Sequence, residues 1–283
     1  MPKGKKENNK SSKSEFQFWI YLWDFIWFYL RAIYYILKSP FYLARYLNNK
    51  QSKISLAKSG KRQGIASDSD YLPFKVLSVR EGSVRAWEDK IRNSDSTIGI
   101  IVGARGSGKT AFGVRLLENL YKKHEKKCYA LGFNEEDMPS WINVVDDTKL
   151  IENDSYVLID EGGVLFSSRR AMSNANKMLS DLLLISRHKN LSIIFIAQNS
   201  SNLDVNIIRQ ADYLVLKQAA LLQKNFERKI IRDIYQKSEK DFSKYGNDKS
   251  ISYVYSDSFN GFIKNGLPSF WSSKISKSFA NKK

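Results

Sequence analysis

The residues best suited to chemistry form one glycine-rich stretch, GARGSGKT. An apolar, β-branched run at residues 97–102 precedes it, and a helical pattern with Phe112, Leu116 and Leu117 on one face follows it. A strand, a glycine-rich turn and a helix in this order are the context in which the P-loop pattern GxxxxGK[ST] binds phosphate. The glycines let backbone N–H groups surround phosphate oxygens, and the helix N-terminus adds a favourable dipole. The predicted phosphate-binding residues are Gly103, Ala104, Arg105, Gly106, Ser107, Gly108, Lys109 and Thr110.

Two side chains of this P-loop have specific expected roles. Lys109 is expected to reach the β- and γ-phosphates of a bound nucleotide, and the hydroxyl of Thr110 is expected to ligate Mg²⁺. The alternative is a chance match in a glycine-containing turn. The strand and helix patterns on either side favour the phosphate site.

A second apolar strand pattern, SYVLIDE, comes about 50 residues later and ends in two acids. In a protein with a P-loop this is the Walker B element, in which Asp160 holds Mg²⁺ through water and Glu161 polarises the attacking water. Two adjacent carboxylates after a strand are otherwise a common solvated turn, but their position after the P-loop favours Walker B. We therefore predict that the chain binds ATP and Mg²⁺, and Glu161 indicates hydrolysis rather than a switch or a small-molecule kinase.

The strand pattern LSIIFIAQ ends in a polar amide, Gln198. At the carboxyl edge of a strand beside the P-loop strand, this glutamine can hydrogen-bond the γ-phosphate or the attacking water. The alternative is a loop glutamine that faces solvent.

Strand and helix patterns alternate from Thr97 onward, which predicts an α/β fold with a mostly parallel sheet covered by helices on both faces. This is the architecture of a P-loop NTPase. Strands are expected at 97–102, 127–133, 155–160, 192–197 and 212–217, with a further possible strand at 141–145; helices are expected at 108–123, 170–187 and near 204–210.

The order of four segments, GARGSGKT, VLIDEGG, SRHKNLSIIFIAQ and IIRQADYLVLK, resembles the FtsK/HerA superfamily of DNA-pumping ATPases. Relatives in that superfamily include conjugative coupling proteins, genome-packaging ATPases of membrane-containing viruses and zonula occludens toxin-like assembly proteins of filamentous phages. The resemblance covers roughly residues 95–235. The Walker motifs alone occur in many P-loop proteins. The glutamine after the strand LSIIFIA and its spacing from the preceding arginine make the resemblance specific to this superfamily.

This resemblance implies roles for further residues. Gln198 would be the sensor, and Arg187, 11 residues before it, would act in trans as the finger that completes a neighbour's site. Arg209 is the second candidate for the finger, and a surface ion pair is the alternative for either arginine. Arg169 and Arg170 could instead face a central channel and DNA. The resemblance also implies DNA as a partner and a homo-oligomeric ring, which is expected to be a hexamer.

The net charge is +17, with a pI near 9.7, and suits a polyanionic partner such as nucleic acid or an anionic membrane surface. Residues 1–65 hold thirteen of the lysines and arginines against three acids. Most of the excess charge therefore flanks the aromatic N-terminal segment. The single cysteine, Cys128, excludes an internal disulfide and fits a reducing compartment.

The segment 16–47 is strongly aromatic, and polar residues interrupt it at every seventh position. An interfacial helix is the favoured interpretation, because it keeps the flanking lysines on one side and places tryptophan and tyrosine at the headgroups. A membrane-spanning helix and a soluble packed helix are the alternatives. We expect the protein at the cytoplasmic face of a host-cell or virion membrane. The interrupting residues are Gln17, Asp24, Arg31, Lys38 and Arg45.

Composition and motifs divide the chain into five expected parts. They are a disordered basic tail at 1–15, a membrane-associating aromatic helix at 16–47, a linker at 48–70, the P-loop ATPase domain at 71–240, and a C-terminal extension at 241–283 that docks on the ATPase core.

The leading functional hypothesis is a Mg-ATP-hydrolysing ring motor that translocates DNA, in packaging or extrusion of a viral or mobile-element genome at a membrane. The alternative is a membrane-bound, ATP-dependent virion assembly or extrusion factor that does not pump DNA. A nucleotide kinase is a weaker third hypothesis, because no second base-binding lid motif is visible.

Overall fold

The computed structural model describes residues 23, 25–31, 67–160, 172–220 and 223–272 of the chain. The chain forms two compact units, residues 1–62 and residues 63–283. In the first unit, residues 23 and 25–31 are helical, and their aromatic side chains, such as Trp23 and Phe28, are exposed. The remainder of the predicted aromatic helix lies outside the described residues. Within the part of the chain that the structure describes, no helix combines the length and apolarity that crossing a bilayer requires.

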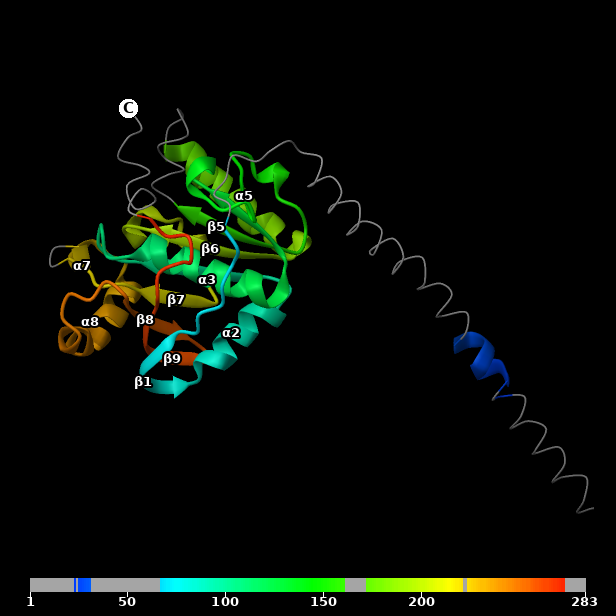
Figure 1. Ribbon diagram of the computed structural model, residues 1–283, viewed down its shortest axis with the longest axis horizontal. Helices are drawn as coiled ribbons and strands as arrows, with labels where there is room; N and C mark the ends of the chain where they lie inside the picture. The colour runs from blue at the N-terminus through cyan, green and yellow to red at the C-terminus, as the bar shows by residue number, and fades with distance from the viewer. Residues whose placement is uncertain (1–22, 24, 32–66, 161–171, 221–222, 273–283) are drawn as a thin grey trace, which may run out of the picture. The chain divides into compact units, whose positions relative to one another are not determined.

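The second unit is built on a nine-stranded sheet with the order β1-β9-β8-β7-β2-β6-β5-β3-β4 (Figure 1). Strands from β7 to β4 in this order run parallel, and the remaining three join through antiparallel pairs. The strands are β1 (Lys75–Gly82), β2 (Thr97–Val102), β3 (Lys127–Leu131), β4 (Ile142–Val144), β5 (Ser155–Asp160), β6 (Leu191–Ala197), β7 (Tyr213–Leu216), β8 (Ile251–Ser256) and β9 (Phe259–Lys264).

The central strands are short apolar runs because both of their faces are covered. Every residue of β2, β5, β6 and β7 is buried. Alternate side chains of β2 enter opposite cores: Ile98 and Ile100 pack in one, and Ile101 packs in the other. The expected mostly parallel sheet with helices on both faces is confirmed.

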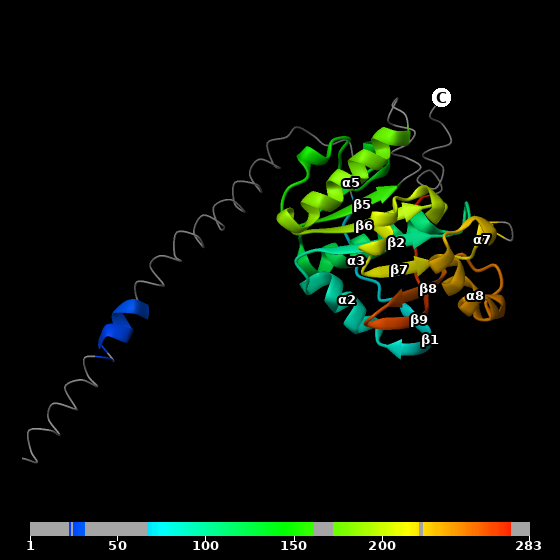
Figure 2. The ribbon, with the colours of Figure 1, turned by 180° about the vertical axis from the view of Figure 1, so that it is seen from behind.

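Each face of the sheet is covered by its own set of helices. Side chains of α2 and α3 share one core, and side chains of α5, α6 and α8 share the other. In both Figure 1 and the reverse view in Figure 2, α8 lies beside β7 and β8. The helices are α2 (Val84–Asn93), α3 (Lys109–His124), α5 (Met172–Lys189), α6 (Val205–Arg209), α7 (Gln223–Phe226) and α8 (Lys229–Lys244), with 3₁₀ turns at Glu135–Asp137, Thr148–Leu150 and Ser200–Asn202.

A buried carboxylate on α3 holds chain segments from both ends of the second unit. Glu118 accepts hydrogen bonds from the backbone N–H of Asp70 at 3.0 Å and of Ser269 at 3.1 Å, and pairs with Arg115 at 2.6 Å. Phe270 then packs edge-on against Trp141. These contacts fasten the residues after β9 to the helix that begins at the P-loop.

The antiparallel side of the sheet differs from the sequence-based expectation. The C-terminal extension predicted at 241–283 contains a hairpin of β8 and β9, which extends the sheet, and β1 pairs with the outer strand of this hairpin. β1 lies at the edge of the sheet, and its residues are exposed or half-buried, so the period of buried residues that marks a strand is weak there.

Candidate active site

The P-loop connects the carboxyl end of β2 to the first turn of α3. Gly106 and Gly108 have φ of 74° and 89°, in the left-handed region that favours glycine. Space is also limiting at Gly108, because an added Cβ would lie 2.7 Å from the carbonyl oxygen of Lys249. The turn between α8 and β8 therefore packs directly against the loop.

Lys109 lies on the loop that it is expected to serve. Its Nζ donates hydrogen bonds to the carbonyl oxygens of Gly103 and Ala104, both at 2.8 Å, and the residue is 7% exposed. These carbonyls hold the ammonium group above the loop, within side-chain reach of the phosphate-binding N–H groups. Phosphate oxygens are alternative acceptors for the same ammonium group.

The two predicted metal ligands lie together at the carboxyl edge of the sheet. The hydroxyl of Thr110 donates to Oδ2 of Asp160 at 3.4 Å, and Asp160, the last residue of β5, is 8% exposed. A hydroxyl and a carboxylate are the oxygen ligands that Mg²⁺ takes from proteins, with water and phosphate oxygens supplying the rest. The residues present therefore fit Mg²⁺.

A further polar atom of the loop supports a ligand site there. The hydroxyl of Ser107 is buried and has no hydrogen-bond partner among the described residues. Those residues contain no group of three or more His, Cys, Asp or Glu side chains that could hold a metal ion alone. A site completed by phosphate and water does not need such a group.

Gln198 lies between the two Walker elements. It follows β6, which pairs with β2 on one side and with β5 on the other. The register aligns Ala197 with Val102, so Gln198 leaves the sheet beside the start of the P-loop. Its side chain is exposed, and its carbonyl oxygen accepts a hydrogen bond from the Gln223 amide. The predicted position, at the carboxyl edge of the strand beside the P-loop strand, is therefore observed.

Arg187 and Arg209 lie at the other edge of the sheet. Arg187 is in the last turn of α5, just before β6 begins, and Arg209 ends α6, just before β7 begins. Both side chains are exposed. Because β6 and β7 run parallel to β2, their amino ends lie opposite the P-loop. The structure therefore does not bring either arginine to the phosphate site of its own chain.

Three predicted residues lie outside the described part of the chain. These are Glu161, expected to polarise water, and Arg169 and Arg170, expected to face a channel. Their assignments stay predictions.

Sequence reasoning missed Lys217, a buried lysine beside the P-loop. Its Nζ donates to the carbonyl oxygens of Lys249 at 2.9 Å and Ile251 at 3.3 Å and to Oδ1 of Asn265 at 3.0 Å. Burial lowers the pKa of Lys217 from 10.5 to about 7, with nearby Asp248 acting in the opposite direction and Lys109 adding to the fall. A lysine that directly follows an apolar strand was the only signal in the sequence.

Lys217 also shapes the start of the P-loop. A Cβ added to Gly103 would lie 2.5 Å from the Cβ of Lys217. The backbone N–H of Lys217 donates a hydrogen bond to the carbonyl oxygen of Val102 at 2.8 Å. The residue thus ties the P-loop to the end of β7 and to the β8–β9 hairpin.

Comparison with known families gives one match, to the family described as Zonular occludens toxin (Zot), over residues 113–237. The matched region begins in α3, after the P-loop, and includes Asp160, Gln198 and both candidate finger arginines. It confirms the predicted resemblance to zonula occludens toxin-like ATPases. No curated protein sequence matches the chain significantly.

Solved structures give distant similarities. The genome packaging NTPase B204 from Sulfolobus turreted icosahedral virus 2, in complex with sulfate, is 16% identical, with a TM-score of 0.44 over 62% of this chain and 98% of that chain. EccC (ATPases 2 and 3) from Thermomonospora curvata is 10% identical, with a TM-score of 0.42 over 65% and 41%. The N-terminal domain of zonular occludens toxin from Neisseria meningitidis is 19% identical, with a TM-score of 0.30 over 43% and 76%.

Proposed function

We propose that this P-loop ATPase of the FtsK/HerA type hydrolyses Mg-ATP in order to translocate DNA, in the packaging or extrusion of a viral or mobile-element genome at a membrane. The observation that carries the proposal is the approach of Thr110 to Asp160 beside Lys109, with Gln198 on the strand between the two Walker elements. This arrangement suits phosphoryl transfer to water, which depends on positioning and on charge stabilisation.

Each described residue has a separate task in this reaction. Backbone N–H groups of the loop and the Lys109 ammonium bind the phosphate oxygens and stabilise the charge that develops on them. Thr110 and Asp160 would hold Mg²⁺, which neutralises charge on the β- and γ-phosphates when it is bound. Gln198 is proposed to orient the attacking water or to contact the γ-phosphate through its amide, and Glu161 is proposed to take the proton of that water.

DNA as the load is supported by the excess of 33 lysines and arginines over 26 acids in residues 66–283, outside the segment that is proposed to bind the membrane. A protein that neutralises phosphates with lysine and arginine binds nucleic acid in a strongly salt-dependent way. A homo-oligomeric ring, proposed as a hexamer, is supported by the exposed positions of Arg187 and Arg209, which are available to a second copy. Residues 16–47 are proposed to hold the ring at the cytoplasmic face of a host-cell or virion membrane.

The test is the ATP turnover of the full chain with and without double-stranded DNA over a range of salt. We expect DNA to stimulate turnover and the stimulation to fall steeply as salt rises. Single-stranded DNA of the same length identifies which form is the load. Lys109→Ala is the control for contaminating ATPases.

Turnover that is indifferent to both forms of DNA at every salt concentration contradicts the motor. That result would favour the alternative function, a membrane-bound assembly or extrusion factor. Co-flotation of the full chain with anionic liposomes tests the membrane proposal separately. Interfacial binding through the basic N-terminal residues should weaken at high salt, because salt screens their attraction to anionic lipids.

A further inference from the structure

A buried carboxylate lies against the turn that follows Gln198. It belongs to Glu227, which stands between α7 and α8 and is 4% exposed. None of the ion pairs among the described residues includes it. A carboxylate that is buried without a cation is costly, so its hydrogen bonds have to stabilise it.

Both oxygens of the Glu227 carboxylate accept hydrogen bonds from this region. Oε2 accepts from the backbone N–H of Ser200 at 2.8 Å and also from the Ser200 hydroxyl. Oε1 accepts from the side-chain amide of Gln223 at 3.0 Å, and the same amide nitrogen donates to the carbonyl oxygen of Gln198. An ionised carboxylate only accepts hydrogen bonds, so it matches these three donors. The contacts therefore hold the backbone on both sides of Asn199.

The next residue, Arg228, holds the rest of the same turn. Its backbone N–H donates to the hydroxyl oxygen of Ser200 at 3.0 Å. Its guanidinium donates to the carbonyl oxygens of Ser200 at 3.0 Å and Leu203 at 2.6 Å. The 3₁₀ turn Ser200–Asn202 is thus bonded to the residues that immediately precede α8.

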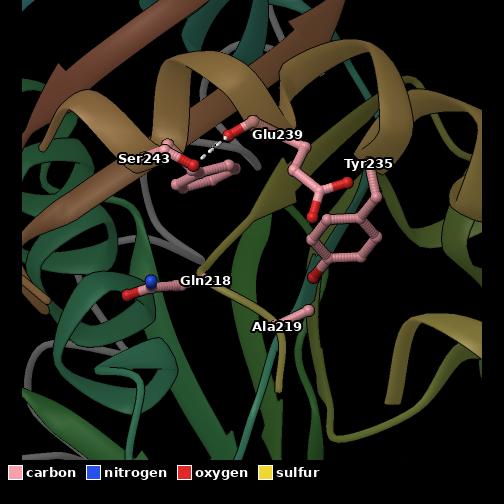
Figure 3. A pocket seen from close by; sticks show the side chains of 6 residues that line it. Gln218, Ala219, Tyr235, Glu239 and Ser243 are labelled. Carbon is pink, nitrogen blue, oxygen red and sulfur yellow. Dashed lines mark hydrogen bonds between the residues drawn. The ribbon is translucent and has the colours of Figure 1, made fainter. Parts of the chain in front are cut away.

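Helix α8 is in turn bonded to the strand that leads into the P-loop. Tyr235 on α8 is 1% exposed, and its hydroxyl lies 3.2 Å from the carbonyl oxygen of Val102 and 3.0 Å from that of Lys217. Figure 3 shows its ring extending from α8 toward Ala219, in the segment after β7. Through α8, the turn after Gln198 is therefore held relative to the start of the P-loop.

We propose that Glu227 is a positioning residue for Gln198: its carboxylate holds the turn after β6 so that the Gln198 amide meets the attacking water. The inference rests on the proposed function, since this role is exercised only when ATP is hydrolysed. Misplacing a group at the reacting centre by about 1 Å can lower the rate about 10²-fold. A side chain at the end of a strand keeps its place only where the residues behind it are themselves held.

The experiment is a double-mutant cycle on ATP turnover by the full chain, with Glu227→Gln and Gln198→Ala made alone and together. Glutamine keeps the size of the side chain but has one acceptor oxygen in place of two, so one set of contacts is lost. We expect Glu227→Gln to lower kcat by about 10- to 100-fold and to change the affinity for Mg-ADP by less than about threefold. In the Gln198→Ala chain it should lower kcat by less than about twofold, because the residue that it positions has lost its amide.

Gln223→Ala is the second variant, and it leaves the bonds between Glu227 and Ser200 in place. It removes the amide that joins the carboxylate to the Gln198 carbonyl oxygen. We expect kcat to fall by about 3- to 10-fold, again only when Gln198 is present. Glu136→Gln is the matched control, because it removes a carboxylate from an exposed position on another 3₁₀ turn. It should leave kcat and the affinity for Mg-ADP unchanged.

Equal losses of kcat from Glu227→Gln in the wild-type and Gln198→Ala chains would show that Glu227 only supports the fold. A fall in the affinity for Mg-ADP that matches the fall in kcat would overturn the inference in the same way. If Glu227→Gln does not fold, Gln223→Ala in the same two chains decides between these outcomes. A wild-type chain without ATP turnover would instead contradict the proposed function.

Discussion

The two edges of the parallel sheet hold different kinds of side chain. At the carboxyl edge, Lys109, Thr110 and Asp160 point into one small region and contact the loop or each other. At the amino edge, Arg187 and Arg209 end helices and are exposed to solvent. One chain therefore supplies the phosphate and metal side of an ATP site. Neither arginine reaches this site within its own chain, so the proposed trans finger would come from another copy.

The polar groups at the amino edge that do form contacts hold the backbone. Oδ2 of Asp212 accepts from the N–H of Ile98 at 2.7 Å, and the Ser96 hydroxyl donates to the carbonyl oxygen of Leu191 at 2.8 Å. These bonds fix where β2 and β6 begin. Polar groups at the carboxyl edge are thus placed to act on a ligand, whereas Asp212 and Ser96 at the amino edge align strands.

Lys109→Ala should have the largest effect on the carboxyl edge. Removing the ammonium leaves the developing charge on the γ-phosphate without its main side-chain cation, so we expect turnover to fall by about 10³-fold or more. The measurement is steady-state ATP turnover, with thermal unfolding as the check that the variant is folded. Substantial turnover in a folded variant would mean that another cation serves the phosphates, and Lys217 would be the first to examine.

Arg187→Ala tests whether the amino edge acts on a neighbouring subunit. A trans finger predicts a loss of turnover of about 10³-fold with nucleotide affinity retained. Arg209→Ala is the parallel variant, and only one of the two should show this pattern. Weakened nucleotide binding without a matching loss of turnover would indicate that the arginine is structural.

Mixing two inactive variants gives a sharper result. In a ring, a subunit with Lys109→Ala keeps its arginine, and a subunit with Arg187→Ala keeps its P-loop. The shared site between them is then complete, so the mixture should regain turnover that neither variant has alone. No recovery over a range of ratios would mean that the arginine does not act across an interface.

The sequence predicts the centre of the sheet well because those strands are buried on both faces. β2 and β5 have the predicted bounds, 97–102 and 155–160, and β6 differs by one residue. The strands at the antiparallel side were harder to predict from the sequence, because their apolar residues do not alternate regularly with polar ones. β9 contains Asn260 and Gly261 within its apolar residues, and β1 is mostly exposed, so the hairpin and its partner were not predicted.

The residues of the candidate site also divide into those that the sequence predicts and those that it does not. Lys109, Thr110, Asp160 and Gln198 follow from local patterns, since each stands at a fixed offset from a strand. Lys217 could not be found in this way, because its burial depends on the turn before β8, about 30 residues later in the chain. A lysine after a strand ordinarily extends into solvent.

The buried position of Lys217 predicts how the free energy of unfolding depends on pH. Its pKa is about 7 in the folded chain and 10.5 when unfolded. Between these values the unfolded state binds more protons, so the free energy of unfolding should rise with pH from about 7 to about 10.5 and be flat below that range. We expect a rise of roughly 1–4 kcal/mol, measured by urea unfolding of wild-type chain minus Lys217→Met at each pH. The exposed Lys240→Met is the control and should retain the wild-type slope.

Asp212→Ala should give the smallest effect and is the most direct test of the role of the amino edge. The substitution removes the acceptor for the N–H of Ile98 at the start of the P-loop strand. A hydrogen bond to a charged group at a partly exposed position contributes about 1–2 kcal/mol, so the free energy of unfolding should fall by that amount. Asp95→Ala, an exposed aspartate in the turn before β2, should change it by less than about 0.5 kcal/mol. Turnover per folded molecule should stay at the wild-type value in both variants, because aligning β2 at its amino end does not alter the loop at its carboxyl end. A loss of turnover with unchanged stability would instead show that the two edges are coupled through β2, and the separation between ligand-binding and strand-aligning groups would no longer hold.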